Sequence, residues 1–160
     1  MSALVTETTR FGRLYLGNKM VGIRQFNFPW FIETAEALRD VPGVAEVFNP
    51  AERDMRAGFY PDPDCEGTLE ELKDLDFSRR EALHADWDWI ARYSEGMVVG
   101  PAWLKSTGTI SEVACHQALG LPVWESRIFL GTAKLLPGER SWDSLLDPSW
   151  QVPPFGMLLS

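Results

Sequence analysis

The sequence predicts an α/β domain built on a doubly wound parallel sheet of about five strands. Short apolar runs that suit buried strands alternate along the chain with longer segments whose apolar residues recur at helical spacing. The chain has 160 residues, of which 45% are hydrophobic, and this is enough for one domain with its own core. Such sheets have right-handed crossovers and bind ligands at the carboxyl ends of their strands.

Buried strands are expected where a short apolar run is bounded by turn residues. Four segments have this pattern: residues 13–16, 44–48, 97–100 and 121–124. Residues 128–136 are apolar enough for a further strand or for a packed helix. With that segment counted as a strand, the sheet has about five strands.

Helices are expected between these strands. Asn27 and Pro29 are typical of a helix start, with Asn as the N-cap and Pro in the first turn. A second helix is predicted over residues 79–92. A third passes through Glu112 and ends at Gly120, which suits a C-cap.

Two features lie between the second strand and the helix over residues 79–92. Residues 50–67 hold several prolines, glycines and charges, and the segment is too long for a simple connector, so it is expected to be a lid or an insertion. Thr68 and Glu71 then have the spacing of a capping box at the start of a short helix.

The domain is expected to span residues 13–136. Residues 1–12 lack the apolar core of a signal peptide and are expected to form a short flexible arm. Residues 137–160 are rich in Pro and Trp, and this tail is expected to pack on the domain or on a second subunit. Its apolar residues Phe155, Met157, Leu158 and Leu159 suit either contact.

Composition excludes several classes of protein. A net charge of -8 argues against a surface for nucleic-acid polymers, which needs clustered Lys and Arg. No run of about 18 apolar residues is present, so no membrane span is expected. The two cysteines, Cys65 and Cys115, are interpreted as free thiols, which favours a reducing cytoplasm.

The segment Lys105-Ser106-Thr107-Gly108-Thr109-Ile110-Ser111-Glu112 is the most informative part of the chain. Its small and hydroxylated residues allow a backbone to approach an anion closely at the start of a helix. Glu112 lies about one helical turn after Gly108, so its carboxylate is expected beside the bound group. The segment predicts a site for chemistry on a phosphorylated small molecule.

Three side chains are expected to converge near this loop. Tyr15 lies on the first strand, Asp86 on the helix before the third strand, and Glu112 on the helix after it. The first and third strands are expected to be neighbours in the sheet. A carboxylate nucleophile with an orienting partner and a second acid is the arrangement that glycosyl transfer requires, here with a nucleobase as the leaving group.

Six short motifs together resemble a domain family of unknown function that is common in phages. They are Tyr15-Leu16-Gly17, Met20-x-Gly22-Ile23, Phe26-Asn27-Phe28-Pro29, Phe48-Asn49-Pro50-Ala51-Glu52, Gly100-Pro101-x-Trp103 and Ser106-x-Gly108-x-x-x-Glu112-x-Ala114. That family is similar to nucleoside 2-deoxyribosyltransferases and to 2′-deoxynucleoside 5′-monophosphate N-glycosidases. The resemblance covers roughly residues 13–124, and the Ser-x-Gly-x-x-x-Glu element is its most specific part.

The resemblance implies a Rossmann-like, deoxyribosyltransferase-like fold and a role for each residue of the converging set. Glu112 resembles the nucleophile that attacks C1′ of the sugar, Tyr15 the residue that orients it, and Asp86 the acid that assists departure of the base. No metal or organic cofactor is implied. Related enzymes form dimers that complete each other's sites, so a homodimer is expected.

The resemblance also implies that the substrate is a nucleotide. Deoxyribosyltransferases acting on free nucleosides commonly have an Asp six residues before the nucleophile, where this chain has Ser106, as the monophosphate glycosidases do. A hydroxyl suits a 5′-phosphate, whereas a carboxylate would repel it. The residues expected to bind the substrate or its phosphate are Ser106, Gly108, Gly17, Lys19, Gly22, Arg24 and Trp103.

One loop departs from the family pattern. Relatives often carry Pro-Met-Arg-Gly where this chain has Lys19-Met20-Val21-Gly22, so the positive charge would have to come from Lys19 or Arg24. Two other functions therefore stay open: transfer of deoxyribose between bases, and nucleotide binding or host interaction without catalysis.

At the level of single residues, structural alternatives are also open. Glu112 and Asp86 could be solvated helix residues, Tyr15 an ordinary buried aromatic, and Ser106 a simple helix cap. His116 shares a helix face with Glu112, but only His84 is available as a second imidazole, so no metal site is expected.

Overall fold

The computed structural model describes residues 11–75, 77–133 and 145–154. Within them a parallel sheet of four strands has the order β2-β1-β3-β4. The strands are β1 (Gly12–Gly17), β2 (Val44–Phe48), β3 (Gly96–Val99) and β4 (Val123–Glu125). The predicted α/β class and the parallel, Rossmann-like sheet are confirmed, and the four expected strand segments lie within two residues of their observed positions.

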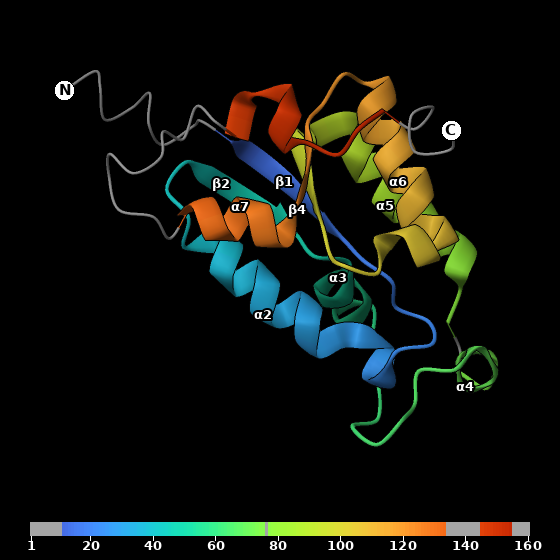
Figure 1. The fold of residues 1–160 in the computed structure, drawn as a ribbon. Coiled ribbons are helices and arrows are strands. Elements are labelled where there is room, and N and C mark those ends of the chain that lie inside the picture. The colour runs from blue at the N-terminus through green and yellow to red at the C-terminus, as the bar shows by residue number, and fades with distance from the viewer. Residues whose placement is uncertain (1–10, 76, 134–144, 155–160) are drawn as a thin grey trace.

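Helices cover both faces of this sheet (Figure 1). On one face lie α2 (Phe28–Arg39) and α7 (Ser126–Ala133), and on the other lie α5 (Arg79–Tyr93) and α6 (Thr107–Ala118). The shorter helices are α3 (Pro50–Arg56), α4 (Leu69–Lys73) and the 3-10 turns η1 (Arg24–Asn27), η2 (Trp103–Lys105) and η4 (Pro148–Trp150). The layer order is therefore helix, sheet, helix.

Strand β1 lies in the interior of the sheet, and its side chains alternate between the two helical layers. Leu14 and Leu16 are fully buried in the cluster beneath α2 and α7. Tyr15 is equally buried but belongs to the cluster beneath α5 and α6. The period of two thus directs Tyr15 toward the two helices that carry Asp86 and Glu112.

The sheet has its switch point between β1 and β3. The chain moves from β1 outward to β2 in one direction, then returns to pair β3 on the other side of β1. Gly17 and Val99 are paired at the carboxyl ends of these strands. Loops leaving such a point diverge to opposite faces and leave a crevice between them, which is where ligands bind in open α/β sheets.

The described residues hold four strands where about five were expected, because residues 126–133 form helix α7, the helical alternative for this segment. Phe129 and Thr132 are both buried, at the spacing of one helical turn, and the Thr132 hydroxyl donates to the Ile128 carbonyl at 2.8 Å. A short apolar run suits a strand or a buried helix equally, so the hydrophobic periodicity of this segment could not distinguish the two. Residues 134–136 lie outside the described part of the chain.

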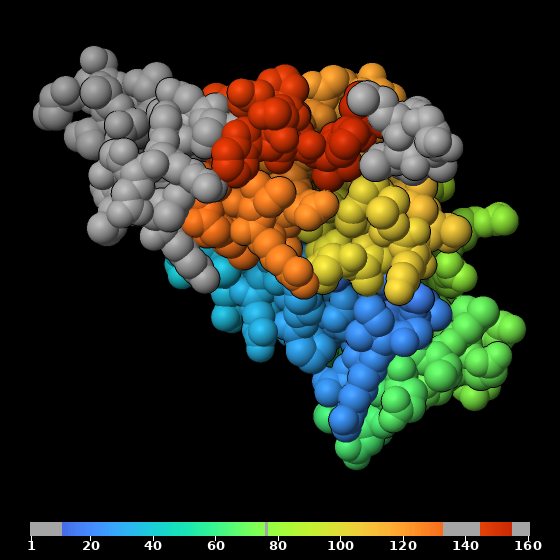
Figure 2. Space-filling view, viewed as in Figure 1, coloured from blue at the N-terminus to red at the C-terminus, as the bar shows by residue number. Residues whose placement is uncertain are grey.

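The segment over residues 50–67 is not the plain lid or insertion that was expected, since its first half is helix α3. Asn49 caps this helix by accepting a hydrogen bond from the Ala51 N–H at 2.9 Å, and Pro50 occupies the first turn. Residues 57–68 then run without regular structure to α4, whose Thr68–Glu71 capping box is confirmed. The Gly22 N–H donates to the Gly67 carbonyl at 2.7 Å, which joins this segment to the first loop. The two segments lie side by side at the surface, where blue meets green in Figure 2.

The structure adds detail at both ends of the expected domain. Phe11, placed in the flexible arm, is buried against Trp124 and Phe129, while residues 1–10 lie outside the described part. In the tail, Leu145 is buried and its carbonyl accepts from the Trp124 indole at 2.6 Å. The four apolar tail residues suggested for an interface, residues 155 and 157–159, fall outside the described residues.

No helix in the described ranges is long and apolar enough to cross a membrane.

Replacing Leu14 by Ala tests whether β1 organises the core. Leu14 has no exposed surface, so truncation leaves a cavity and should lower the free energy of unfolding by about 2–5 kcal/mol. Urea denaturation measures the change. Leu119→Ala, at a side chain 53% exposed, is the control and should stay within about 0.5 kcal/mol of the wild type. Equal losses in the two variants would contradict the assignment.

Candidate functional site

A cavity of about 380 Å³ opens at the carboxyl ends of β1 and β3. Its wall includes Tyr15, Asp86 and Glu112, which come from β1, α5 and α6. The three residues that sequence reasoning selected for catalysis are therefore brought together. A cavity of this size suits a small metabolite of the dimensions of a nucleotide.

Tyr15 and Glu112 are joined by a hydrogen bond in which the Tyr15 hydroxyl donates to Glu112 Oε2. Tyr15 is fully buried and Glu112 nearly so. The Tyr15 ring is held by a stacked contact with Phe48, at 5.3 Å between ring centroids, and by Trp89 at 6.2 Å. The hydroxyl is thereby fixed against the carboxyl group, as expected for a residue that orients a nucleophile.

Both carboxyl groups stand at core positions of their helices. Asp86 lies on the buried face of α5 between Ala82 and Ile90. Glu112 lies on the buried face of α6 next to Val113 and one turn before His116. Apolar side chains would normally occupy such positions, so neither acid is a solvated surface residue.

Burial raises the pKa of both acids. The pKa of Asp86 rises to about 7 because desolvation disfavours its charge more strongly than Arg53 favours it. Desolvation and the nearby Asp86 raise the pKa of Glu112 well above its usual value, while the Tyr15 hydrogen bond lowers it. Burial thus favours the protonated form of both acids, and the Tyr15 hydroxyl opposes this effect at each of them.

The start of α6 forms another wall of the cavity. Ser106 is its N-cap, and its hydroxyl accepts from the Thr109 N–H at 3.2 Å. The first-turn N–H groups of Thr107 and Gly108 have no partner within the helix and carry the positive end of its dipole. A side chain at Gly108 would meet no atom closer than 3.8 Å, so the backbone is open to a ligand there. Ser106 is thus a helix cap that also lines the cavity.

The cavity carries more positive charge than the chain as a whole. Its described lining includes four cationic side chains, from Lys19, Arg53, Arg79 and Lys105, against three carboxyl groups. The chain itself has a net charge of -8. A local excess of cations around a helix N-terminus favours an anionic ligand.

Three residues expected to bind the substrate do not line the cavity. The Arg24 side chain is 62% exposed and forms an ion pair with Asp64 at 3.8 Å. Of the two residues expected to supply positive charge, Lys19 and Arg24, only Lys19 lines the cavity. Gly22 adopts a φ of +92° and supports the loop through its bond to Gly67. Trp103 is buried beneath α5 and α6 in the cluster behind Tyr15, where it packs the site from below.

Sequence reasoning missed the contribution of Asn18. This residue is 5% exposed, and its side-chain oxygen accepts from the N–H groups of Lys19 and Ala102 at 2.9 and 3.1 Å. Its carbonyl accepts from the Thr109 hydroxyl at 3.0 Å. Asn18 therefore ties together the loops after β1 and β3 and the start of α6. Its place directly after Gly17 was the available signal.

Arg53 and Asp54 were also missed. They lie in the segment over residues 50–67, which was interpreted as a lid or an insertion, so the helix that directs them inward was not expected. Asp54 is 3% exposed and lines the cavity with Arg53. Burial raises the pKa of Asp54 to about 6, against the opposing effect of Arg53.

Part of the cavity wall is aromatic. Five phenylalanines line it: Phe26, Phe28, Phe31, Phe59 and Phe77. Phe26 reaches this position through an unusual backbone, because Gln25, Phe26 and Asn27 have φ values of 55°, 52° and 62°. Left-handed backbone costs free energy in residues other than glycine and is commonly retained where it positions a functional group.

His116 is not arranged as a metal ligand. Its Nδ1 lies 2.7 Å from the Glu112 carbonyl and its Nε2 lies 2.7 Å from the Ser94 hydroxyl, so both nitrogens face protein partners. Burial lowers its pKa to about 4. Among the described residues, no group of three or more His, Cys, Asp or Glu side chains is placed to hold a metal ion. Cys65 and Cys115 are free thiols.

Comparison of the chain with protein-family models, with curated proteins and with solved structures gave no match.

The pH dependence of stability tests the buried state of Asp86. Its folded-state pKa of about 7 lies above the ordinary 3.8, so the folded protein holds a proton that the unfolded chain releases between these values. This group's contribution to stability therefore falls as the pH rises through that window. Asp86→Asn, which cannot ionise, should exceed the wild-type stability at pH 8 by about 1–3 kcal/mol and lose most of this advantage by about pH 4.

Urea denaturation at the two pH values measures the difference. Asp88→Asn is the matched control on the same helix, because Asp88 is exposed and pairs with Arg92 at 2.8 Å. It should show no gain that depends on pH. A gain in Asp86→Asn of the same size at both pH values would contradict the buried, protonated carboxyl group.

Proposed function

We propose that this protein is an N-glycosidase that cleaves the bond between base and sugar in (2′-deoxy)nucleoside 5′-monophosphates. One observation carries the proposal: a carboxyl group held by a tyrosine hydroxyl shares its cavity with a second buried acid and with a cation-lined helix start. A paired nucleophile and acid suit glycosidic cleavage, and the helix start suits a phosphate.

The cavity offers a separate environment for each part of such a substrate. The phosphate would lie at the N–H groups of Thr107 and Gly108, near Lys19 and Lys105. The base would lie among the phenylalanine side chains, where its faces are apolar. The sugar would then lie between these ends with C1′ near Glu112. Binding energy from the phosphate and base would thereby hold the reacting atoms in place.

In the first step, a carboxylate oxygen of Glu112 forms a bond to C1′ while the bond from C1′ to the base nitrogen breaks. The electron pair of that bond leaves with the base, and Asp86 supplies the proton that neutralises it. The Tyr15 hydroxyl donates to Glu112, which favours the ionised nucleophile and would keep it aimed at C1′ as positive charge develops on the sugar.

In the second step, water attacks C1′ of the glycosyl-enzyme and the bond to Glu112 breaks. The Asp86 carboxylate, which has given up its proton, accepts one from this water and returns to its starting state. The products are a free base and a sugar 5-phosphate. A second base in place of water would give transfer of the glycosyl group, which is the reaction of the transferases that the motifs resemble.

Base release from nucleotides tests the proposal. The wild-type protein, incubated with the common ribo- and deoxynucleoside 5′-monophosphates, should release free base that chromatography detects. Glu112→Gln should lower kcat by about 1,000-fold or more, because the amide cannot form the glycosyl-enzyme. Asp88→Asn, at an exposed acid on α5, should keep wild-type activity.

Each other outcome has a defined meaning. A folded protein that releases no base from any nucleotide would overturn catalysis. Nucleotide binding in calorimetry without turnover would instead indicate a non-catalytic binding protein. A new nucleotide formed when a second base is added would indicate transfer.

Sedimentation at several protein concentrations tests the predicted homodimer.

The 5′-phosphate should be required for efficient cleavage. Nucleosides should therefore react with a lower kcat/KM than their monophosphates, and Lys105→Ala should raise KM for the monophosphate by about 10-fold. Kinetics with matched nucleoside and nucleotide pairs measure both effects. Lys73→Ala, at an exposed lysine outside the cavity lining, is the control. Equal kcat/KM for nucleosides and nucleotides would contradict a phosphate site.

A further inference from the structure

Helix α3 directs two charged side chains, Arg53 and Asp54, into the cavity. Neither of them takes part in the two proposed catalytic steps. Arg53 Nη2 lies 2.7 Å from Asp54 Oδ1 and 3.4 Å from Asp86 Oδ1. The Arg53 side chain is 17% exposed, and those of Asp54 and Asp86 are 4% and 9% exposed. One guanidinium group thus lies between two buried carboxyl groups.

These contacts are ion pairs without good hydrogen-bond geometry. Arg53 Nε, Asp54 Oδ1 and Asp86 Oδ1 are buried and have no hydrogen-bond partner. Buried polar atoms rarely stay unpaired, because desolvating them costs about 1–3 kcal/mol each. Their clustering around one cation marks this as a site where charge has a role beyond stability.

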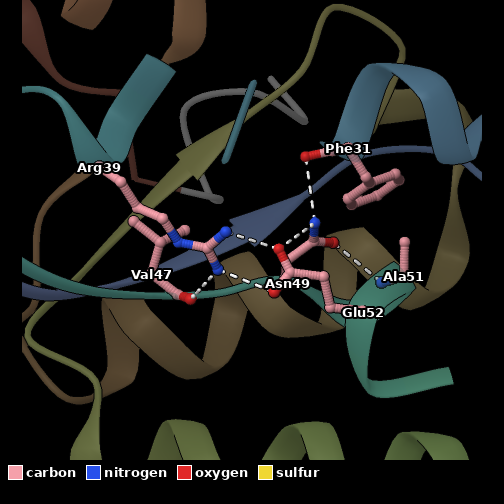
Figure 3. Close-up of polar contacts among 6 residues, drawn as sticks. All are labelled: Phe31, Arg39, Val47, Asn49, Ala51 and Glu52. Atoms are coloured by element: carbon pink, nitrogen blue, oxygen red, sulfur yellow. Dashed lines mark hydrogen bonds and ion pairs between the residues drawn. The ribbon is translucent and has the colours of Figure 1, made fainter. Parts of the chain in front are cut away.

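The start of α3 is held firmly, which fixes where Arg53 points. Arg39 from α2 binds both oxygens of Glu52, at 2.6 and 2.8 Å, and also donates to the Val47 carbonyl (Figure 3). Asn49 caps the helix and donates to the Phe31 carbonyl at 3.1 Å. The first turn of α3 is therefore tied to α2 and to β2, and the next residues are Arg53 and Asp54.

The charges that face Asp86 come from three elements. Tyr15 approaches from β1, Glu112 from α6, and Arg53 with Asp54 from α3. On α5 itself, the buried neighbours of Asp86 one turn away are the apolar Ala82 and Ile90. Within the described chain, Arg53 is the cation that pairs with two of these three acids, Asp54 and Asp86.

We propose that Arg53 is a positioning residue that serves Asp54 and Asp86 as a shared counter-ion, and that it fixes which carboxyl groups in the cavity carry a proton. The shorter contact keeps Asp54 ionised and holds the guanidinium in place. Asp86 makes only the longer contact, so its burial outweighs the cation and keeps it protonated until the base departs. The role of Asp86 as proton donor rests on the proposed function.

The contact with Arg53 stabilises the negative charge that develops on Asp86 during the first step. Asp86 becomes a carboxylate as it gives its proton to the leaving base, and the new charge forms 3.4 Å from a fixed cation. An interaction that strengthens as the transition state is approached raises kcat more than substrate affinity. Arg53 also lowers the pKa values of Glu112 and Tyr15, which favours the ionised nucleophile.

The test compares three variants at one helix. Arg53→Gln removes the charge, Arg53→Lys keeps it as an ammonium that cannot span both acids, and Arg56→Gln is the matched control at an exposed arginine of α3. Because a nearby cation lowers the pKa of an acid, Arg53→Gln should move both limbs of the pH profile of kcat/KM upward by about 1–3 pH units. It should also lower kcat at neutral pH by about 100-fold, with a smaller change in KM.

Arg53→Lys should recover part of the lost kcat and show a pH profile of kcat/KM between those of Arg53→Gln and the wild type. Arg56→Gln should match the wild type. If Arg53→Gln does not fold, the Arg53→Lys profile decides the question. A loss of activity in both Arg53 variants with unmoved limbs would show a merely structural role and overturn the proposal.

A titration that needs no turnover separates this inference from the proposed function. NMR of protein labelled with ¹³C at the aspartate carboxyl carbons, with Asp86→Asn and Asp54→Asn used for assignment, follows both groups directly. Both should titrate at higher pH in Arg53→Gln than in the wild type. Such a shift without base release in any assay would retain Arg53 as the shared counter-ion and reject the glycosidase. If Arg53→Gln leaves both titrations unshifted and the wild-type protein releases base, the glycosidase is retained and the role of Arg53 as shared counter-ion is rejected.

Discussion

The hydrogen bond from Tyr15 to Glu112 is the contact around which the site is arranged. It links the interior strand of the sheet to the helix that follows the neighbouring strand, so it forms only when β1 pairs with β3 and α6 packs on that face. The same packing places Asp86 from α5 in the cavity wall. A register shift of one residue in β1 would turn Tyr15 to the other face, where Leu14 and Leu16 now lie.

Keeping these acids buried opposes folding. Asp54, Asp86 and Glu112 all have raised pKa values because desolvation disfavours their ionised forms. Hydrophobic side chains at the same positions would give a more stable domain. The fold tolerates the group because apolar clusters on both faces of the sheet stabilise the surrounding framework. Such a trade of stability for a strained, charged cavity is typical of sites that carry out chemistry.

The cavity also shows why the overall charge of a chain is a poor guide to its ligand. The protein is acidic, yet cationic side chains and the start of α6 meet at one edge of the sheet. They come from the loop after β1, from α3, from the start of α5 and from the loop before α6. Segments that are far apart in the sequence thus together supply the positive electrostatic potential of the cavity. Aromatic side chains in the same lining complete a site that offers both charged and apolar contacts to a small anionic molecule.

The sequence by itself determined the parallel α/β class, four strand positions and the convergence of Tyr15, Asp86 and Glu112. Period-two and helical patterns carry that information, because they record which side chains must be buried. It did not determine helix α7, helix α3 or the inward placement of Arg53. Strand and buried helix share one apolar pattern over a short run, and Asn-Pro begins turns and helices alike. Only the tertiary structure decided between them, because packing against α2 and capping by Asn49 supply the difference in free energy. It also removed Arg24, Gly22 and Trp103 from the cavity wall, since neighbourhood in sequence does not fix the direction of a side chain.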